Sequence, residues 1–223
     1  ILSLLSYDDI KDLVVYAGEI IKSESLGDEI QCFVHAPFSD DCEDVQDKNE
    51  PSIVLQVRLY NYLDKFERET NILMTGDTTY TVLDKIVDIS KSKGNEEYLK
   101  WDIYDIPHHC SYTGLNEKDE NETYRITPTE NIQWLLSQAM KNAKMVASCD
   151  EITEETSPPH LIAKRAYEYY TADDVDFLVT MEHYIDEEDK PSPIIFNIDY
   201  LGVTKESIDS QKVYFKKLSP RAG

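Results

Sequence analysis

Two stretches decide the fold, NILMTGD at residues 71–77 and WDIYDIPHHCS at residues 101–111. Each is a short run of apolar residues, typical of a buried strand, that ends in polar residues. Between them, residues 79–93 carry apolar side chains at helical intervals, and Gly94 follows as a residue that ends helices. The two stretches therefore predict a strand–helix–strand unit with polar side chains where both strands end.

The flanking residues extend this unit on both sides. Residues 52–63 alternate apolar and polar side chains, which predicts a strand paired antiparallel with residues 71–76 across the polar turn at 64–70. Other strands are expected at 29–37, 144–149, 176–185 and 193–202, and helices at 8–23, 131–143 and 156–170. We expect the last two strands to pair across the acidic turn at 186–192, and the acidic residues 39–50 to form a loop.

The order of these elements predicts the α/β (α+β) class, as one domain over residues 1–223 with a mixed sheet and helices outside. Hydrophobic residues make up 41% of the chain and aromatic residues 10%, which excludes a disordered protein. The chain has 44 acidic and 22 basic residues, and the resulting net charge of −22 excludes a histone-like coat for nucleic acid. No run approaches the roughly 18 apolar residues that a membrane span needs.

The cysteines and the start of the chain indicate its cellular setting. Cysteines stand at positions 32, 42, 110 and 149, without a CxxC pair. This spacing fits neither a zinc ribbon nor a disulfide scaffold, and it favours reduced thiols in a cytoplasmic protein. The apolar run at residues 1–5 is too short for a signal peptide, and a start at Ile1 indicates a piece whose true beginning lies upstream or was removed.

Polar residues that follow three predicted strands are candidate metal ligands. Asp77 follows the first of these strands, His108 and His109 follow the next, and His160 comes after one further crossover. Because neighbouring strand ends in a parallel sheet lie about 5 Å apart, we expect these side chains to converge. Imidazole and carboxylate groups together bind Zn²⁺, Mn²⁺ or Fe²⁺ and leave positions open for water.

Each candidate also has a structural interpretation. A Gly-Asp pair after a strand is often only a turn, and a His-His pair at a loop entrance can be an accident of the surface. His160 could simply cap or pack beside Pro159. We interpret His35 and His183, which lie within predicted strands, as structural residues. The joint spacing of the other histidines and Asp77 is what favours a site.

NILMTGD followed by WDIYDIPHHCS resembles the TGD and HHGS signature of the metallo-β-lactamase superfamily, in particular the branch of the competence-related DNA-uptake hydrolase domain. That branch also has an Asn-x-x-Ser, matched here by Asn49 and Ser52. It has a strand ending in Ser before a Pro-His helix entry, matched by VASCDEITEETSPPHLIAKR at 146–165. The resemblance covers roughly residues 8–200, and Cys110 stands where the signature has glycine.

This resemblance implies the C-terminal half of a four-layer αβ/βα sandwich, with one or two divalent metal ions, Zn or Mn, between its sheets. Asp77 would bridge the metals. One of His108 and His109 would be a ligand, and the other would contact substrate phosphate or orient the first. His160 would contact substrate or donate a proton to the leaving group. The implied protein is a metal-dependent hydrolase, a phosphodiesterase or nuclease, that uses a metal-activated water.

The first metal-binding run of the family, His-x-His-x-Asp-His, does not occur in these residues, so they cannot hold a complete binuclear site. The chain is then one piece of a divided protein, a truncated sequence, or a degenerate member that serves as a non-catalytic interaction or regulatory subunit. A fold half standing alone would leave a broad apolar sheet face exposed. We therefore expect contact with the missing N-terminal half or with a partner subunit, and no contact with a membrane. A phosphodiester substrate or nucleic acid would be reached through the metals.

Overall fold

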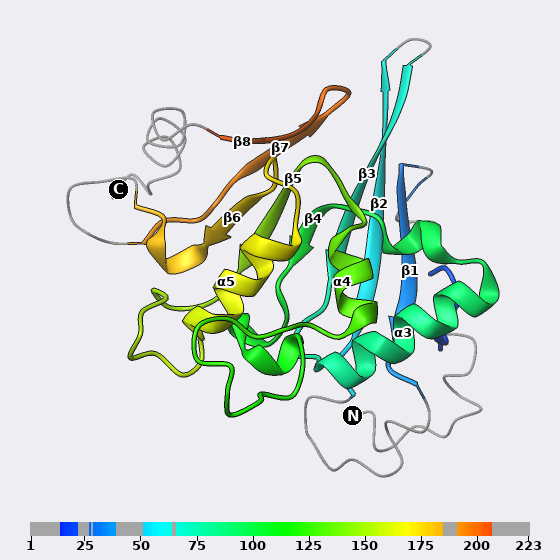
Figure 1. Ribbon diagram of the computed structural model, residues 1–223. Coiled ribbons are helices and arrows are strands. Elements are labelled where there is room, and N and C mark those ends of the chain that lie inside the picture. Colours follow the sequence, from blue (N-terminus) through cyan, green and yellow to red (C-terminus); the bar gives the residue numbers. More distant parts are fainter. Residues whose placement is uncertain are drawn as a thin grey trace, which may run out of the picture.

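Six strands form one mixed sheet in the computed structural model, which describes residues 14–21, 27, 29–38, 51–63, 66–184 and 191–206 (Figure 1). In spatial order they are β1 (Ile30–Ala36), β2 (Val54–Leu63), β3 (Phe66–Met74), β4 (Trp101–Asp105), β5 (Ala139–Ala147) and β6 (Asp176–Val179). The first three run antiparallel to one another, and β3 to β6 run parallel. The protein is thus of the α/β class with a mixed sheet.

The hairpin of β2 and β3 confirms the antiparallel pair expected from the alternation of side chains. Val57 lies opposite Ile72, and the register continues outward to Leu63 opposite Phe66. The polar turn expected at 64–70 is therefore wrong for residues 66–70, which belong to β3, while 64–65 lie outside the described residues. The two strands stay paired beyond the apolar residues. Backbone hydrogen bonds and cross-strand ion pairs, such as that of Arg58 with Glu69, hold them together there and do not need an apolar face.

Helices cover one face of this sheet (Figure 1). They are α3 (Tyr80–Lys93), α4 (Glu130–Leu136) and α5 (Leu161–Tyr170). Their buried side chains pack on Leu73, Tyr104 and Met145 of the central strands and form the core. Helix α3 ends as expected at Gly94, whose φ of 72° is left-handed and whose N–H donates to the Ser90 carbonyl. No helix in the described part of the chain is long and apolar enough to cross a membrane.

Short 3-10 turns connect several of these elements. They are η3 (Glu96–Leu99), η4 (Pro107–Cys110), η5 (Tyr112–Gly114) and η6 (Thr180–Glu182). Two of them, η4 and η5, follow β4, and η4 carries the predicted histidine pair. The loop after β4 is therefore a structured segment that can hold its side chains in place.

The expected helix at 131–143 is wrong in its second half, because α4 ends at Leu136 and residues 139–143 belong to β5. The Ser137 hydroxyl and the Gln138 amide both donate to the Trp134 carbonyl, at 2.6 Å and 3.1 Å. These two side chains thus take the place of the backbone N–H that would bond to the Trp134 carbonyl if the helix continued for another turn. Ala139 pairs with Trp101 of β4 instead.

The expected pairing of strands 176–185 and 193–202 is also wrong, although an antiparallel bridge joins Tyr184 to Pro191 across the predicted acidic turn. Strand β6 ends at Val179 and pairs in parallel with β5, where Lys144 Nζ lies 2.7 Å from the Asp176 carboxylate. The residues beyond it form a separate two-stranded sheet of β7 (Phe196–Asp199) and β8 (Gly202–Lys205). A tight turn after Asp199 closes this hairpin, and its return at Gly202 has a φ of 114° that favours glycine.

The N-terminal expectation of a helix at 8–23 is wrong where the structure describes it, at 14–21. Those residues contain a turn at Gly18, with φ 93°, and an antiparallel bridge from Ile20 to Phe33. The edge of β1 that faces away from β2 explains the difference. Its backbone groups form hydrogen bonds with this segment, and the Gly18 N–H donates to the Val34 carbonyl at 2.8 Å. Residues 8–13 and 22–23, Asn49 and the expected loop at 39–50 lie outside the described residues.

The sheet face opposite the helices is apolar but only partly buried. The register places one row of side chains across it, from Cys32 through Val57, Ile72 and Ile103. Met74 on this face is 46% exposed, whereas Leu73 beside it on the helical face is 1% exposed. Further half-buried apolar residues of this face are Leu55, Leu59, Val146 and Leu178. In the part of the chain that the structure describes, the hydrophobic core therefore lies mainly on the helical face of the sheet.

Candidate functional site

The carboxyl ends of β3, β4 and β5 meet at one edge of the sheet, and the loops that leave them form the candidate site. Asp77 follows β3 through Thr75 and Gly76. The two loops are joined by the N–H of His108, which donates to the Gly76 carbonyl at 3.0 Å. The Thr75 hydroxyl donates to the backbone carbonyl at the end of β4. Parallel pairing thus brings together the loops that carry Asp77 and the histidines, as the crossover predicts.

Three consecutive residues in the loop after β4 adopt the left-handed conformation, His108, His109 and Cys110, with φ of 50°, 52° and 61°. Such a run is unfavourable for residues with a Cβ, at roughly 1–2 kcal/mol each, and it persists only where surrounding contacts hold it. The N–H of Ser111 donates to the His108 carbonyl at 2.8 Å, and the N–H of His160 donates to the Cys110 carbonyl at 3.0 Å. The loop and the entry to α5 therefore hold each other in place.

Cys110 adopts a backbone conformation that suits the glycine of the family signature. Replacing it with glycine is expected to change the free energy of unfolding by less than about 1 kcal/mol, because relief of the strain offsets the lost buried side chain. Cys110→Val is expected to cost about 3 kcal/mol or more, since a β-branched residue fits neither the positive φ nor the packed site. Urea unfolding of both variants measures this. Equal stability of the two would contradict the argument.

His109 is the histidine that meets Asp77, with Nε2 3.2 Å from Oδ1. Its other nitrogen, Nδ1, lies 2.7 Å from the Ser148 carbonyl and must donate to it. This hydrogen bond fixes the ring and leaves Nε2 facing the carboxylate, free to carry a proton or to bind a metal. Two ligands with bonds of about 2.1 Å to one metal, at an angle near 100°, lie about 3.2 Å apart. The pair therefore has the spacing of two ligands of one cation.

The pair contributes little to stability, because both side chains are about half exposed to solvent, 52% for His109 and 48% for Asp77. A strained loop that ends in an exposed ion pair is typical of a functional site rather than of a structural one. This combination favours a functional role for His109 and Asp77 over the alternative in which they are only a turn and a surface histidine.

His108 is directed elsewhere. Its Nδ1 lies 3.0 Å from the Thr113 hydroxyl, which itself donates to the Ser111 hydroxyl at 3.0 Å. Because the Thr113 proton is used in that second bond, His108 Nδ1 is the donor in the first. His108 is thus oriented by η5 and not by Asp77, and the structure distinguishes two histidines that the sequence leaves equivalent.

Asp105, at the end of β4, is a site residue that the sequence reasoning missed. Burial raises the pKa of its carboxyl group, and the charge of Asp77 raises it further. Hydrogen bonds from the Gly76 backbone and from Ser148, together with the charge of His109, act in the opposite direction. Asp105 is therefore a second carboxylate beside the pair of His109 and Asp77. Its position as the last residue of a buried strand, just before Pro107 and the histidines, was the available signal.

His160 lies in a neighbouring hollow rather than beside Asp77. Its Nε2 is 3.0 Å from the Ser157 hydroxyl, and its ring packs edge-on against Tyr112 at 4.7 Å. Burial lowers the pKa of His160, and the charges of Lys118 and His108 lower it further. Its Nδ1 is buried and has no hydrogen-bond partner among the described residues.

Two hollows therefore make up the site region. His109 lines one of about 470 Å³ together with Ser148 and Asp150. His160 lines the other, of about 440 Å³, together with Lys118 and Arg165. Pro158 and Pro159 border the first hollow and Ser157 the second, so the segment before α5 runs between them. The single cleft expected for Asp77, the histidine pair and His160 is divided in this way.

Among the remaining described histidines and cysteines, Cys149 also lines the hollow of His109. His35 and His183 are buried, and neither lines these two hollows. Cys32, Cys110 and Cys149 are free thiols, while Cys42 lies outside the described residues. Burial raises the pKa of Cys149 to about 11 and raises that of Cys110 as well, so both thiols stay protonated at neutral pH.

The comparisons with family models, with curated proteins and with solved structures found no match for this chain. The resemblance to the metallo-β-lactamase superfamily therefore rests on the motifs alone. Among the described residues, no three His, Cys, Asp or Glu side chains are grouped so as to hold a metal ion. Asp77 and His109 supply two ligands of a suitable type, and any complete centre needs more.

Proposed function

We propose that this chain is part of a metal-dependent hydrolase that acts on phosphodiesters, and that Asp77 and His109 hold one divalent cation, Zn²⁺ or Mn²⁺. The observation that carries the proposal is the pair itself, with Nε2 and Oδ1 3.2 Å apart and Nδ1 held by the Ser148 carbonyl. A histidine whose far nitrogen donates to a backbone carbonyl is the usual arrangement of a metal ligand. A cation at this point would supply a water of lowered pKa and a positive charge.

The other residues of the site take supporting roles in this proposal. Asp105, held by Gly76 and Ser148, adds negative charge on the cation side. His108 contacts a phosphate oxygen of the substrate. His160 donates a proton to the leaving group, which requires a substrate that extends over Pro158 and Pro159 from one hollow to the other. Lys118 and Arg165 in the second hollow would contact an anionic substrate, although Glu154 and Glu155 line the same hollow and balance their charge.

We further propose that a second polypeptide segment, the N-terminal half of the sandwich or a partner subunit, supplies the missing ligands. The half-buried apolar face of the sheet supports this, because Met74 and its neighbours lie on the side where a second sheet would pack. The alternative function, a non-catalytic interaction module, is favoured by the finding that the described residues group only two suitable ligands.

The test is metal analysis of the protein, together with any chain that co-purifies with it, and an assay of bis(4-nitrophenyl) phosphate hydrolysis with added Mn²⁺ or Zn²⁺. The proposal expects bound metal and metal-dependent hydrolysis. A preparation that is metal-free and inert with both ions would contradict it and favour the interaction module.

His160→Ala is expected to leave the metal content unchanged and to slow turnover by about 10²–10⁴-fold, the usual contribution of a proton donor. The metal content stays because His160 lies in the second hollow, away from the pair of His109 and Asp77. Metal analysis and the turnover number measure the two effects separately. Loss of metal from this variant would place His160 among the ligands instead.

A further inference from the structure

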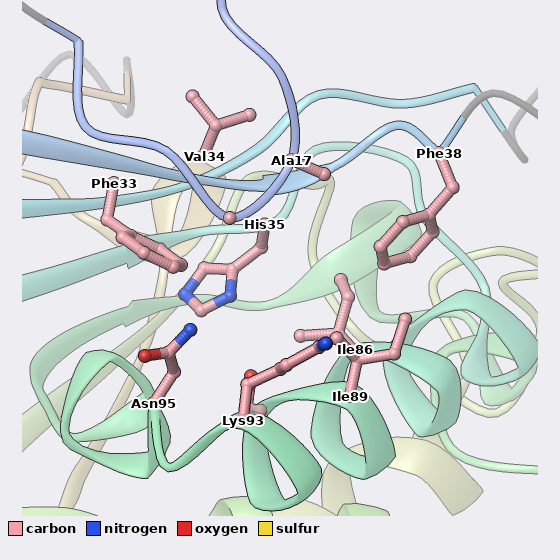
Figure 2. Close-up of a pocket in the computed structure, with 11 residues that line it drawn as sticks. Ala17, Phe33, Val34, His35, Phe38, Ile86, Ile89, Lys93 and Asn95 are labelled. Atoms are coloured by element: carbon pink, nitrogen blue, oxygen red, sulfur yellow. The ribbon is translucent and has the colours of Figure 1, made fainter.

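A third cavity, of about 350 Å³, lies between β1 and the C-terminal half of α3 (Figure 2). Its walls are apolar, with Phe33 and Phe38 on the strand side and Ile86 and Ile89 on the helix. It shares no residue with the hollows around His109 and His160. Its size is at the small end of ligand pockets, and apolar walls with a few polar groups are typical of them.

His35 contributes a polar atom to this cavity. Its ring projects from β1 toward α3 (Figure 2). Nε2 lies 3.0 Å from the Tyr98 carbonyl and therefore donates to it. Burial lowers the pKa of His35 to about 4, so the ring is neutral at pH 7 and Nδ1 is an acceptor. Among the described residues Nδ1 has no hydrogen-bond partner.

Lys93 contributes a positive charge at the mouth of the cavity. Figure 2 shows its side chain reaching back from the end of α3 toward Ile86 and Ile89. Within the part of the chain that the structure describes, no carboxylate pairs with its ammonium group. Lys91, on the same turn, has partners instead, since it bonds to Asn131 at 3.0 Å and lies over the Trp134 ring at 4.5 Å.

We propose that this cavity binds a small aromatic acid that carries a hydroxyl or ring N–H group. A planar ring fits between Phe33 and Phe38 on one side and the helix on the other, where apolar contact with these side chains favours it. The hydroxyl would donate to His35 Nδ1, and the acid group would face Lys93. The two polar features of the ligand match His35 Nδ1 and the Lys93 ammonium group, which have no polar partner among the described residues. Nothing in this site depends on the proposed hydrolase.

The probe is 4-hydroxyphenylacetate, titrated into the full chain by isothermal calorimetry. A ligand of this size that satisfies both polar groups is expected to bind with a Kd of about 10–100 μM. Phenylacetate lacks the donor and is expected to bind about tenfold more weakly, because His35 Nδ1 is left unpaired. Tyramine keeps the hydroxyl but is a cation, and it is expected to bind at least tenfold more weakly because it faces Lys93.

Two matched variants test the location. Lys93→Gln is expected to weaken binding of 4-hydroxyphenylacetate about tenfold and to remove the preference for the acid over tyramine. Lys91→Gln removes the same charge two residues earlier, on the side of α4, and is expected to leave binding unchanged within about twofold. Both lysines are exposed, so both variants are expected to fold, which circular dichroism checks.

Three results would overturn the proposal. The first is no binding of 4-hydroxyphenylacetate at 5 mM (about fiftyfold above the weakest expected Kd) to a folded full chain. The second is equal affinity for the three probes, which would mean simple partition into an apolar space. The third is equal loss of binding in Lys93→Gln and Lys91→Gln, which would mean that overall charge and not this cavity attracts the acid.

Discussion

Asp77→Ala is expected to abolish metal-dependent phosphodiester hydrolysis, with a loss of at least about 10³-fold, while the free energy of unfolding changes by no more than about 0.5 kcal/mol. The large functional effect follows from its place as one of the two proposed ligands, with Oδ1 3.2 Å from His109 Nε2. The small effect on stability follows because its carboxylate is about half exposed and its ion pair with His109 contributes little.

The measurement compares metal content, hydrolysis and urea unfolding of Asp77→Ala with those of the wild type. His109→Ala is expected to behave in the same way, and loss of its bond to the Ser148 carbonyl adds only a small cost in stability. Asp173→Ala, which removes an exposed carboxylate from the loop before β6, is the matched control and should change none of the three. Hydrolysis at the wild-type rate by Asp77→Ala would contradict the proposed metal centre.

Acidification from pH 7 to pH 4 is expected to lower the free energy of unfolding by about 3 kcal/mol through His35 alone. Burial lowers the pKa of this histidine from 6.5 to about 4, and its bond to the Tyr98 carbonyl opposes that shift only in part. At a pH between these two pKa values, His35 is protonated in the unfolded chain and neutral in the folded chain. The contribution of neutral His35 to the free energy of unfolding is therefore fully present above about pH 6.5. It is lost as the pH falls toward the pKa of His35 in the folded state.

Urea unfolding of the wild type and of His35→Gln, at several values between pH 7 and pH 4, measures this contribution. Glutamine keeps a donor for the Tyr98 carbonyl but does not titrate, so it is expected to remove most of the slope that His35 causes. Buried carboxyl groups such as Asp102 and Asp105 have raised pKa values and act with the opposite sign, but they are common to both proteins. Parallel pH profiles of the two proteins would show that His35 does not carry the effect.

The elements that the sequence predicted well are those specified by local pattern. The alternation at 52–63, the helical spacing at 79–93 and the glycine at 94 are confirmed by β2, α3 and its left-handed C-cap. Period and capping residues act within a few residues of the chain, so they do not depend on what packs against the element. The hairpin register follows from the same alternation, because a slip by one residue would turn every apolar side chain to the other face.

The elements that the sequence predicted wrongly are those decided by a distant partner. Residues 139–143 have helical spacing, yet they form the first part of β5, because Ala139 pairs with β4 and the residues that follow, 144–147, pair with β6 as well. Residues 14–21 also have apolar periodicity, but the free edge of β1 pairs with them. Strand β7, within the predicted strand at 193–202, pairs with β8, which begins at Gly202, and not with β6. In each case tertiary hydrogen bonds outweigh a local preference of less than about 1 kcal/mol per residue.

For the site, the sequence by itself determined the residue types and the fact that Asp77 and the histidine pair follow neighbouring parallel strands, since chain order and crossover spacing suffice for that. Only the tertiary structure decided that His109 and not His108 faces Asp77, because the choice depends on the left-handed turn and on the carbonyl of Ser148, which follows β5. It also added Asp105 and placed His160 in a separate hollow. Side-chain direction depends on contacts between segments far apart in the chain, and no pattern within one segment contains them.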